Sequence, residues 1–372
     1  MSRVFWTAAW SKNLSDTLWA KISNLWDAAG FSEMIAPGRL VAIKAPLGGI
    51  GSHYYLRPLV IRAITEKVIA AGGQPVITDT TNTLWNRENP SFSWHEEVAV
   101  KGYSANSCGA PLVIANGYAG EDGMLVPTTG AELGGIEVAQ AIYEAEAIIV
   151  VTHVTGHPLA GISGAVTALG SECLTSSGRR RLHEGIKPIF KGELCNHCGL
   201  CVANCPWGAL ISNGTGPRLL PDCCKGCIRC LAYCPQRAIT VCDSHKRLFQ
   251  RRVAEAATAV QRTARGKIGI FSFLVDITPQ PDCYPSSGPP LVVDIGFLAS
   301  QDPVAADSAS VSLIQAAQGF PRDFLPIKEG VEKFALATGA DPWFLLDVAA
   351  GLGLGKKDYE LLEVPEEGKG NA

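Results

Sequence analysis

Short apolar runs alternate along the chain with longer segments in which apolar residues recur every three or four positions. The predicted strands are residues 39–44 (RLVAIK), 75–80 (PVITDT), 111–116 (PLVIAN), 148–153 (IIVVTH), 267–276 (KIGIFSFLVD) and 290–296 (PLVVDIG). The predicted helices are residues 15–29, 56–73, 134–147, 243–265 and 304–317. Strands that alternate with helices are typical of the α/β class. We therefore predict an open, mostly parallel sheet flanked by helices.

Charged or polar side chains stand where several predicted strands end. They are Lys44, Asp79, His153, Asp276 and Asp294. Open α/β sheets bind ligands outside the carboxyl ends of their strands, so these side chains could share one crevice. The alternative is that they only begin polar loops, as residues after any strand do.

Four residues near this edge are candidates for chemistry. His153 or His157 could supply a proton, because imidazole titrates near neutral pH. Asp79 could orient the histidine, and Lys44 could hold the anionic group of a small substrate. Structural or hydrogen-bonding roles for the two histidines remain an open alternative.

Composition and charge narrow the class of protein. The 372 residues are 47% hydrophobic and 18% charged, which is enough for a large core in two or more units. The net charge of −3 argues against a general nucleic-acid or anionic-membrane binder. No apolar run approaches the ~20 residues needed to cross a bilayer, and residues 1–16 lack a signal-like apolar run. We expect a cytoplasmic protein, in which the run Arg179-Arg180-Arg181 faces solvent unless it binds an anion.

Most of the thirteen cysteines lie between residues 195 and 242, in two copies of one spacing pattern. The first copy is Cys195, Cys198, Cys201 and Cys205-Pro206, and the second is Cys224, Cys227, Cys230 and Cys234-Pro235. Each position recurs 29 residues later, which indicates a duplicated unit. In a cytosolic chain such clustered spacing indicates metal binding rather than disulfides.

The duplicated spacing resembles that of bacterial two-cluster ferredoxins. The resemblance assigns one [4Fe-4S] cluster to Cys195, Cys198, Cys201 and Cys234, and the other to Cys224, Cys227, Cys230 and Cys205. Structural zinc is the rival interpretation, but zinc sites pair their ligands and give no reason for a third cysteine and a Cys-Pro. Cys223 is expected to stay unligated, because using it would break the spacing.

From about residue 40 to 315, the chain also resembles the ferredoxin-containing branch of domain-of-unknown-function family 362. The matching stretches include TDTTNTLW (78–85), VTHVTGHPLAGISGA (151–165), SGRRRLH (177–183), FSFLVDITPQPDCYP (271–285) and LVVDIGFLASQDPVAADSAS (291–310). The resemblance adds Asp282 and Cys283 to the candidate pocket. The chain departs from the family pattern at Thr155, at Val166-Thr167-Ala168 and at Pro281, where a lysine, Leu-Lys-Asn and a cysteine are often found. If the lysines of the family pattern bind an anionic substrate, these departures imply that this chain has a different substrate, or none.

These observations predict an α/β domain interrupted by a small α+β two-cluster ferredoxin-like domain. The expected boundaries are 1–186, 187–242 and 243–372. The first functional hypothesis is an iron–sulfur oxidoreductase that passes electrons to a substrate or cofactor in the crevice. The second is an electron-transfer or redox-sensing adaptor that docks a partner protein, and a non-redox enzyme with structural clusters is the third. An electron donor or acceptor protein is implied, and the chain could form a homo-oligomer.

Overall fold

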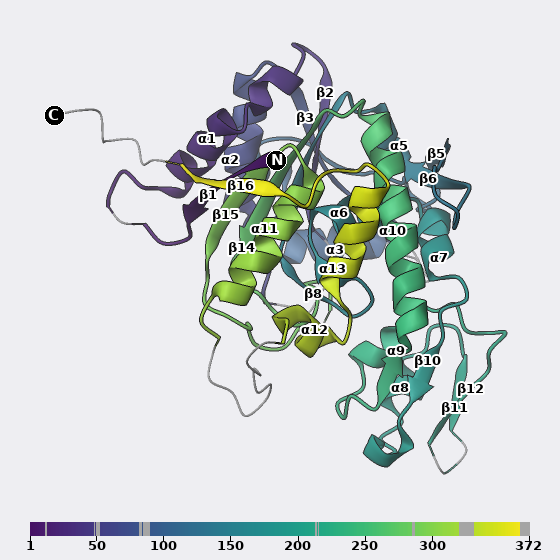
Figure 1. Ribbon diagram of the computed structural model, residues 1–372. Coiled ribbons are helices and arrows are strands. Elements are labelled where there is room, and N and C mark those ends of the chain that lie inside the picture. Colours follow the sequence, from purple (N-terminus) through teal and green to yellow (C-terminus); the bar gives the residue numbers. More distant parts are fainter. Residues whose placement is uncertain are drawn as a thin grey trace.

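The computed structural model describes residues 1–11, 13–47, 49, 53–81, 84, 90–212, 214, 216–284, 287–319 and 331–364. Its centre is an eight-stranded sheet in the order β16-β1-β15-β14-β7-β2-β3-β4 (Figure 1). Only β15 runs antiparallel to its neighbours, so the sheet is mostly parallel. The strands are β1 (Ser2–Ala8), β2 (Leu40–Lys44), β3 (Gln74–Asp79), β4 (Leu112–Ile114), β7 (Ala147–His153), β14 (Ile268–Leu274), β15 (Gly296–Ser300) and β16 (Tyr359–Glu363). The predicted fold class is confirmed.

Helices cover both faces of the sheet, so its central strands are apolar on both sides. Along β7, Ile148 and Val150 face one core, while Ile149 and Val151 face the other. The second core packs against α1 (Leu18–Ala28), η1 (Phe31–Met34), α2 (Pro58–Ala70), α3 (Pro90–Val100) and α4 (Ala105–Cys108). The first packs against α5 (Gln140–Glu144), α6 (Ala165–Glu172), α7 (Ser176–His183), α10 (Asp243–Thr263), α11 (Pro303–Ala316), α12 (Lys333–Thr338) and α13 (Pro342–Gly351). No helix of the described residues is long and apolar enough to cross a membrane.

Two predicted elements were wrong. The segment predicted as a helix over 134–147 forms β6 (Gly135–Ala139) and the short α5, because Ile136 and Val138 alternate into the core and pair with β5 (Gly123–Pro127). The strand predicted over 290–296 begins only at Gly296. The preceding segment starts with two prolines, which lack the N–H that a sheet ladder needs. A second hairpin joins β8 (Thr155–His157) and β9 (Gly161–Ser163).

Residues 187–242, called here the cysteine module, lie beside the end of α10 and away from the large sheet (Figure 1). The module contains β10 (Pro188–Phe190), η2 (Gly192–Leu194), α8 (Leu200–Ala203), β11 (Leu210–Ser212), β12 (Pro217–Leu219), α9 (Arg229–Ala232) and β13 (Ile239–Val241). Each half has a strand, a short helix and a second strand. In the second half these elements begin at residues 217, 229 and 239, each 29 residues after its counterpart at 188, 200 and 210. The first strand of each half pairs antiparallel with the last strand of the other.

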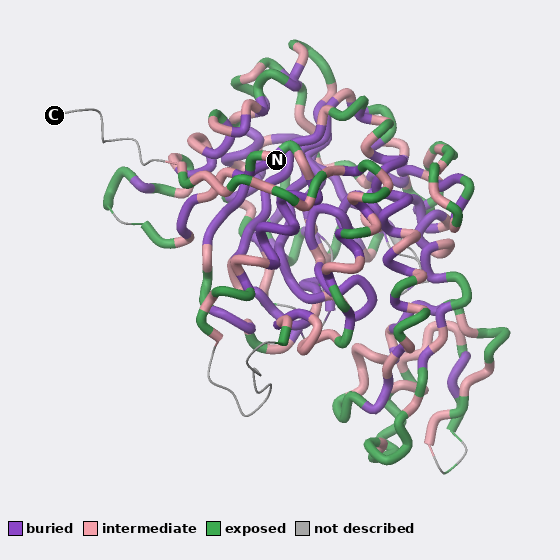
Figure 2. The backbone as a smooth tube through the Cα atoms, in the orientation of Figure 1, coloured by how far each residue is buried: buried purple, intermediate pink, exposed green. Residues whose placement is uncertain are grey.

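The duplication extends to individual backbone angles. His197 and Gly226 have φ of 59° and 69°, and Gly208 and Arg237 have φ of 59° and 50°. A positive φ is costly for residues other than glycine, so its recurrence at matching positions indicates that both halves impose the same loop. Much of the module is exposed, whereas the sheet and its helices are largely buried (Figure 2). The boundaries 1–186, 187–242 and 243–372 stay a prediction.

Candidate functional site

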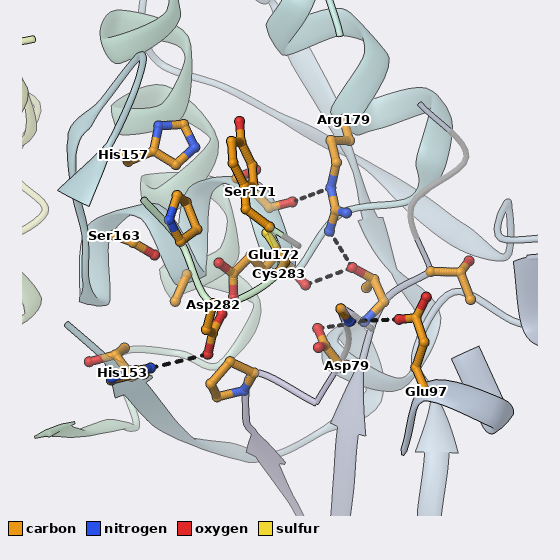
Figure 3. A pocket seen from close by; sticks show the side chains of 18 of the residues that line it. Asp79, Glu97, His153, His157, Ser163, Ser171, Glu172, Arg179, Asp282 and Cys283 are labelled. Atoms are coloured by element: carbon orange, nitrogen blue, oxygen red, sulfur yellow. Dashed lines mark hydrogen bonds and ion pairs between the residues drawn. The ribbon is translucent and has the colours of Figure 1, made fainter. Parts of the chain in front are cut away.

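A cavity of about 230 Å³ lies at the carboxyl ends of β3 and β7 (Figure 3). Three of the predicted residues, Asp79, His153 and His157, line its wall. Parallel strands end at the same edge, which brings these side chains together although they are far apart in sequence. Asp276 and Asp294 meet each other instead, since the Asp276 N–H donates to the Asp294 carboxylate over 2.8 Å.

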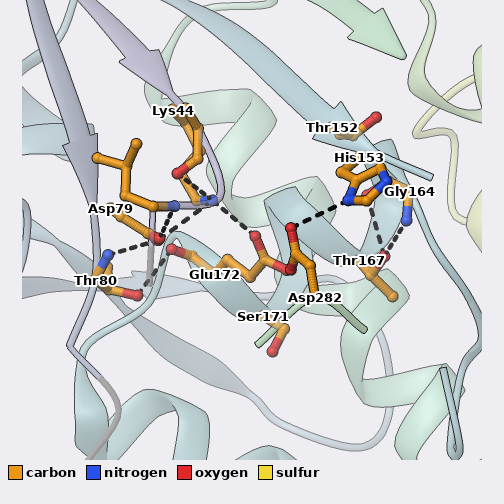
Figure 4. A network of polar contacts seen from close by, with 12 residues as sticks. Lys44, Asp79, Thr80, Thr152, His153, Gly164, Thr167, Ser171, Glu172 and Asp282 are labelled. Atoms are coloured by element: carbon orange, nitrogen blue, oxygen red, sulfur yellow. Dashed lines mark hydrogen bonds and ion pairs between the residues drawn. The ribbon is translucent and has the colours of Figure 1, made fainter. Parts of the chain in front are cut away.

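Lys44 lies beneath this wall, fully buried, and its ammonium group is held by two carboxylates (Figure 4). Its Nζ is 3.3 Å from Asp79 Oδ1 and 2.7 Å from Glu172 Oε2. Burial alone lowers the pKa of Lys44, but the charges of Asp79 and Glu172 raise it overall. The lysine therefore stays protonated, with its charge already compensated. The pairing leaves Lys44 poorly placed for its predicted role of holding an anionic substrate.

His153 is buried between two hydrogen-bond acceptors. Its Nδ1 is 3.3 Å from Asp282 Oδ2, and its Nε2 is 2.8 Å from the carbonyl oxygen of Val275. Burial by itself lowers the pKa of His153, but the hydrogen bond and charge of Asp282 raise it overall. A ring with an acceptor at each nitrogen is suited to the imidazolium form. Both of its protons are engaged, so His153 is a poor proton source for a substrate.

The His153–Asp282 pair should make stability depend on pH. Because the folded-state pKa of His153 is raised, the pair contributes fully below the unfolded-state pKa of about 6.5. That contribution is lost as the pH rises through the folded-state pKa. We expect Asp282→Asn to lower the Tm by a few degrees at pH 6, for a loss of about 1–2 kcal/mol, and by less at pH 9. Thermal unfolding of both proteins across this pH range measures the difference. A Tm difference between the two proteins that does not change with pH would contradict the charged state of His153.

His157 is held in the opposite protonation state. Its Nδ1 accepts hydrogen bonds from the N–H groups of Leu159 and Ala160, at 3.2 and 3.0 Å. Burial lowers the pKa of His157 to about 4. Two donors at Nδ1 place the single ring proton on Nε2. His157 can therefore donate a hydrogen bond to a ligand in the cavity, but its Nδ1 is not free to take up a proton.

Two further residues of the wall, Arg179 and His183, are presented four residues apart by α7, and sequence reasoning missed His183 (Figure 3). Arg179 was expected to face solvent unless it bound an anion, and it is only 8% exposed. Its Nε donates to the Ser171 carbonyl oxygen over 3.1 Å, and its Nη2 donates to Thr80 Oγ1. The four-residue spacing on a short helix was the available signal, because residues at i and i+4 share one face.

The second cysteine loop forms part of the same wall. Cys227 and Ile228 line the cavity beside His183, whose Nδ1 is 3.0 Å from the Gly226 carbonyl oxygen. A Cβ at Gly226 would lie 2.4 Å from the carbonyl oxygen of His183, so only glycine allows this approach. Lys187 Nζ also bonds the Cys224 carbonyl oxygen over 2.7 Å. The bond of Lys187 lies within the module, whereas the contact of His183 with Gly226 holds the loop of a predicted cluster ligand against the α/β domain.

The predicted cluster cysteines influence one another across the two motifs. Burial raises the pKa of the Cys227 thiol to about 11, and the nearby Cys205 and Cys224 contribute to the rise. Burial likewise raises the pKa of Cys201, with a contribution from Cys234. The fourth cysteine of each motif therefore lies near the other motif. Backbone N–H groups donate to the sulfurs of Cys205 and Cys234 over 3.3 Å each.

No three His, Cys, Asp or Glu side chains of the described residues converge in a way that would hold a single metal ion. Cluster ligands need not converge on one point, because each thiolate of a cubane binds a different iron atom. Burial differs between the two predicted sets of cluster ligands. Cys227 and Cys230 of one set are buried, whereas Cys198 of the other is exposed. Cys223 is also exposed. The ligand assignment remains a prediction.

Cys283 and Tyr284 complete the wall near the second cysteine loop. Burial raises the pKa of Tyr284 well above its usual value, and the thiols of Cys283, Cys227 and Cys230 add to the effect. Cys283 is exposed to the cavity, but desolvation by the protein groups around it and the charge of Asp282 raise the pKa of its thiol. The Cys283 thiol is therefore protonated at neutral pH, and Tyr284 lies near two predicted cluster ligands.

Comparisons with known proteins give a family but no activity. A search of curated proteins found no match. Among solved structures, the lactate racemase apoprotein from Thermoanaerobacterium thermosaccharolyticum is 12% identical, with a TM-score of 0.40 over 87% of this chain. A structural-genomics protein from Thermotoga maritima is 13% identical, with a TM-score of 0.34 over 71% of this chain. The matched part spans 60% and 52% of those two chains. The family model for a domain of unknown function, DUF362, matches residues 41–312, and the chain belongs to this family.

Proposed function

We propose that the protein is an iron–sulfur oxidoreductase of the ferredoxin-containing DUF362 branch. Two [4Fe-4S] clusters in residues 187–242 would exchange electrons with a small molecule in the cavity of the α/β domain. One observation carries the proposal: Cys227 is both a predicted cluster ligand and a lining residue of the cavity. An adaptor that only docks a partner would not need a polar cavity against a cluster ligand.

The donor set fits two clusters with crossed ligation. Cys205 lies near Cys227 and Cys224, and Cys234 lies near Cys201, as the exchange of the fourth ligand requires. Iron binding requires thiolates, so the raised pKa values of the buried thiols mean that protons leave when the clusters assemble. The N–H groups that donate to Cys205 and Cys234 would stabilise the thiolates.

The burial of the cysteines gives the two clusters different positions. The cluster assigned to Cys195, Cys198, Cys201 and Cys234 is called here the outer cluster, since Cys198 is exposed. The cluster assigned to Cys224, Cys227, Cys230 and Cys205 is called the inner cluster, since Cys227 and Cys230 are buried and Cys227 lines the cavity. Electrons would enter from a partner protein at the outer cluster and reach the cavity through the inner one. The clusters supply single electrons, and the surrounding residues position the substrate.

The residues of the cavity have separate tasks in this proposal. His157 offers its Nε2–H to a substrate oxygen or nitrogen. The Lys44–Asp79–Glu172 network and the His153–Asp282 pair fix the shape and charge of the floor. Ala168 and Pro281 stand where the family pattern differs, and both line the cavity. The substrate of this chain should therefore differ from that of relatives with larger or charged side chains at these positions.

A cavity-filling variant tests the proposal. Ala168 is 3% exposed on α6, so Ala168→Leu should occupy cavity volume at a cost of about 1–3 kcal/mol in stability. Dithionite-reduced, desalted protein would be mixed anaerobically with a protein-free extract of small metabolites, and cluster re-oxidation followed by absorbance. We expect re-oxidation by the wild type and at least a tenfold slower rate in Ala168→Leu, with unchanged iron content.

The matched control changes the outer face of the module. Leu200 is 42% exposed beside the outer cluster, and Leu200→Glu should leave re-oxidation by small molecules unchanged. Exposed apolar side chains at Ile189, Leu194, Leu200 and Ile211 favour a docked partner and keep the adaptor as the second candidate. Re-oxidation only by a protein fraction, with no effect of Ala168→Leu, would support the adaptor instead.

A further inference from the structure

Arg179 is a charged side chain of the cavity wall whose guanidinium forms no direct ion pair with a carboxylate of the described residues. It donates hydrogen bonds to the Ser171 carbonyl oxygen and the Thr80 hydroxyl, and both acceptors are neutral. Within the described part of the chain, no carboxylate forms an ion pair with Arg179, although its charge helps to lower the pKa of Glu172. A buried guanidinium without a counter-ion carries a large desolvation cost.

The acidic side chains of the cavity, unlike Arg179, form direct ion pairs or accept hydrogen bonds from backbone N–H groups. Asp79 accepts hydrogen bonds from the N–H groups of Leu47 and Thr80 in addition to the Lys44 ion pair. Glu172 is paired with Lys44, and Asp282 with His153. Glu97 accepts from the Gly49 N–H over 2.6 Å, and burial raises its pKa. Asp79 and Glu172 share the single positive charge of Lys44, and Arg179 acts on Glu172 only through its charge, without an ion pair between them.

The neighbouring arginines are used differently. Arg180 forms an exposed ion pair with Glu121 over 2.9 Å, and Arg181 donates to the Leu133 carbonyl oxygen over 2.7 Å. Only Arg179 of this run points into the cavity (Figure 3). Its hydrogen bonds to Ser171 and Thr80 use Nε and one N–H of Nη2, which leaves the Nη1 side of the planar guanidinium to bind a carboxylate or phosphate through two parallel hydrogen bonds.

We propose that Arg179 binds the oxyanion of the cavity's small-molecule ligand, a carboxylate or a phosphate. Only the redox fate of that ligand rests on the proposed function. The anion site itself follows from the cavity and from the guanidinium of Arg179 that lines it. A volume of about 230 Å³ limits the ligand to the size of a small metabolite. His157 adds an Nε2–H donor for a second polar group of the ligand. The role first assigned to Lys44 thus passes to Arg179.

Anion binding can be measured without the natural substrate. Acetate and inorganic phosphate serve as probes, with chloride at equal ionic strength as the reference, and the Tm of anaerobic cluster-loaded protein gives the apparent Kd of each anion. We expect at least one of the two to raise the Tm of the wild type in a saturable way. The anion with the lower Kd identifies the carboxylate or the phosphate class.

Variants locate the effect. Arg179→Gln should weaken binding at least tenfold, Arg179→Lys should weaken it less, and Arg180→Gln should bind as the wild type does. If neither anion raises the Tm, or if Arg179→Gln binds as tightly as Arg180→Gln, the proposal is wrong. The result is independent of the re-oxidation experiment: anion binding without re-oxidation would keep this site and overturn the oxidoreductase. Should Arg179→Gln fail to fold, the comparison of Arg179→Lys with Arg180→Gln decides.

Discussion

Protein prepared without oxygen is expected to contain about eight iron and eight sulfide atoms per chain, because each cysteine motif supplies three ligands to one cubane and one to the other. Reduction should give the EPR spectrum of two interacting [4Fe-4S]⁺ centres. Iron and sulfide analysis with EPR measures both quantities. Zinc in place of iron, or about four iron atoms per chain, would contradict the assignment.

Single cysteine variants test the crossed ligation, which is the most specific part of this prediction. Cys205 belongs to the first motif but lies near Cys227 and Cys224 of the second. Cys205→Ser should therefore damage the inner cluster, and Cys234→Ser the outer one, with about four iron atoms lost in each case. Cys223→Ser is the matched control, since Cys223 is exposed and adjacent to Cys224 but outside the spacing. If Cys223→Ser loses a cluster and Cys224→Ser keeps both, the cluster ligand is Cys223 and not Cys224.

The features predicted best from the sequence were those that depend on local residue spacing: the duplicated cysteine module and the central strands. The repeat of 29 residues in the cysteine motifs reappears in the strands, helices and φ angles of the module, because each loop is specified by its own few residues. The strands at 39–44, 75–80 and 148–153 were also located within a residue or two, since central parallel strands are continuous apolar runs. Their common direction then placed Asp79 and His153 at one edge.

The chemical state of the site residues could not be predicted in this way. Lys44 and Glu172 are 128 residues apart, and their ion pair decides whether Lys44 can bind a substrate. Asp282 decides the charge of His153 from 129 residues away. Arg179 seemed a surface residue because it begins a run of three arginines, and only the packing of α7 turns it inward. Charge compensation depends on tertiary neighbours, which a single sequence does not specify.

Lys44→Met is expected to be among the most destabilising single substitutions outside the cysteine motifs. The ammonium group is fully buried and serves two carboxylates, at 3.3 Å to Asp79 and 2.7 Å to Glu172. Its removal leaves two negative charges close together without their cation. Breaking a buried pair in this way costs about 3–5 kcal/mol. The free energy of unfolding, measured on cluster-loaded protein under anaerobic conditions, should fall by that amount at pH 7.

The pH dependence and a double variant identify the cause. Burial raises the pKa of Glu172, but Lys44 lowers it overall, so the pair stabilises the fold above the unfolded-state pKa of about 4.5 and loses effect as the pH falls through the folded-state pKa. The penalty of Lys44→Met should therefore shrink toward pH 4, where the carboxylates take up protons. Glu172→Gln added to Lys44→Met should restore part of the stability at pH 7, because one of the two uncompensated charges is gone.

A second buried lysine provides the control for this experiment. Lys21 pairs with Asp16 over 2.7 Å and is 4% exposed, but neither residue lines the cavity. Lys21→Met should also destabilise the protein, and by less, since one carboxylate is left uncompensated instead of two. It should leave acetate and phosphate binding unchanged, whereas Lys44→Met should alter it by freeing Asp79 and Glu172 near Arg179. If Lys44→Met costs no more than the ~0–1 kcal/mol of a surface ion pair, the buried network does not exist as described.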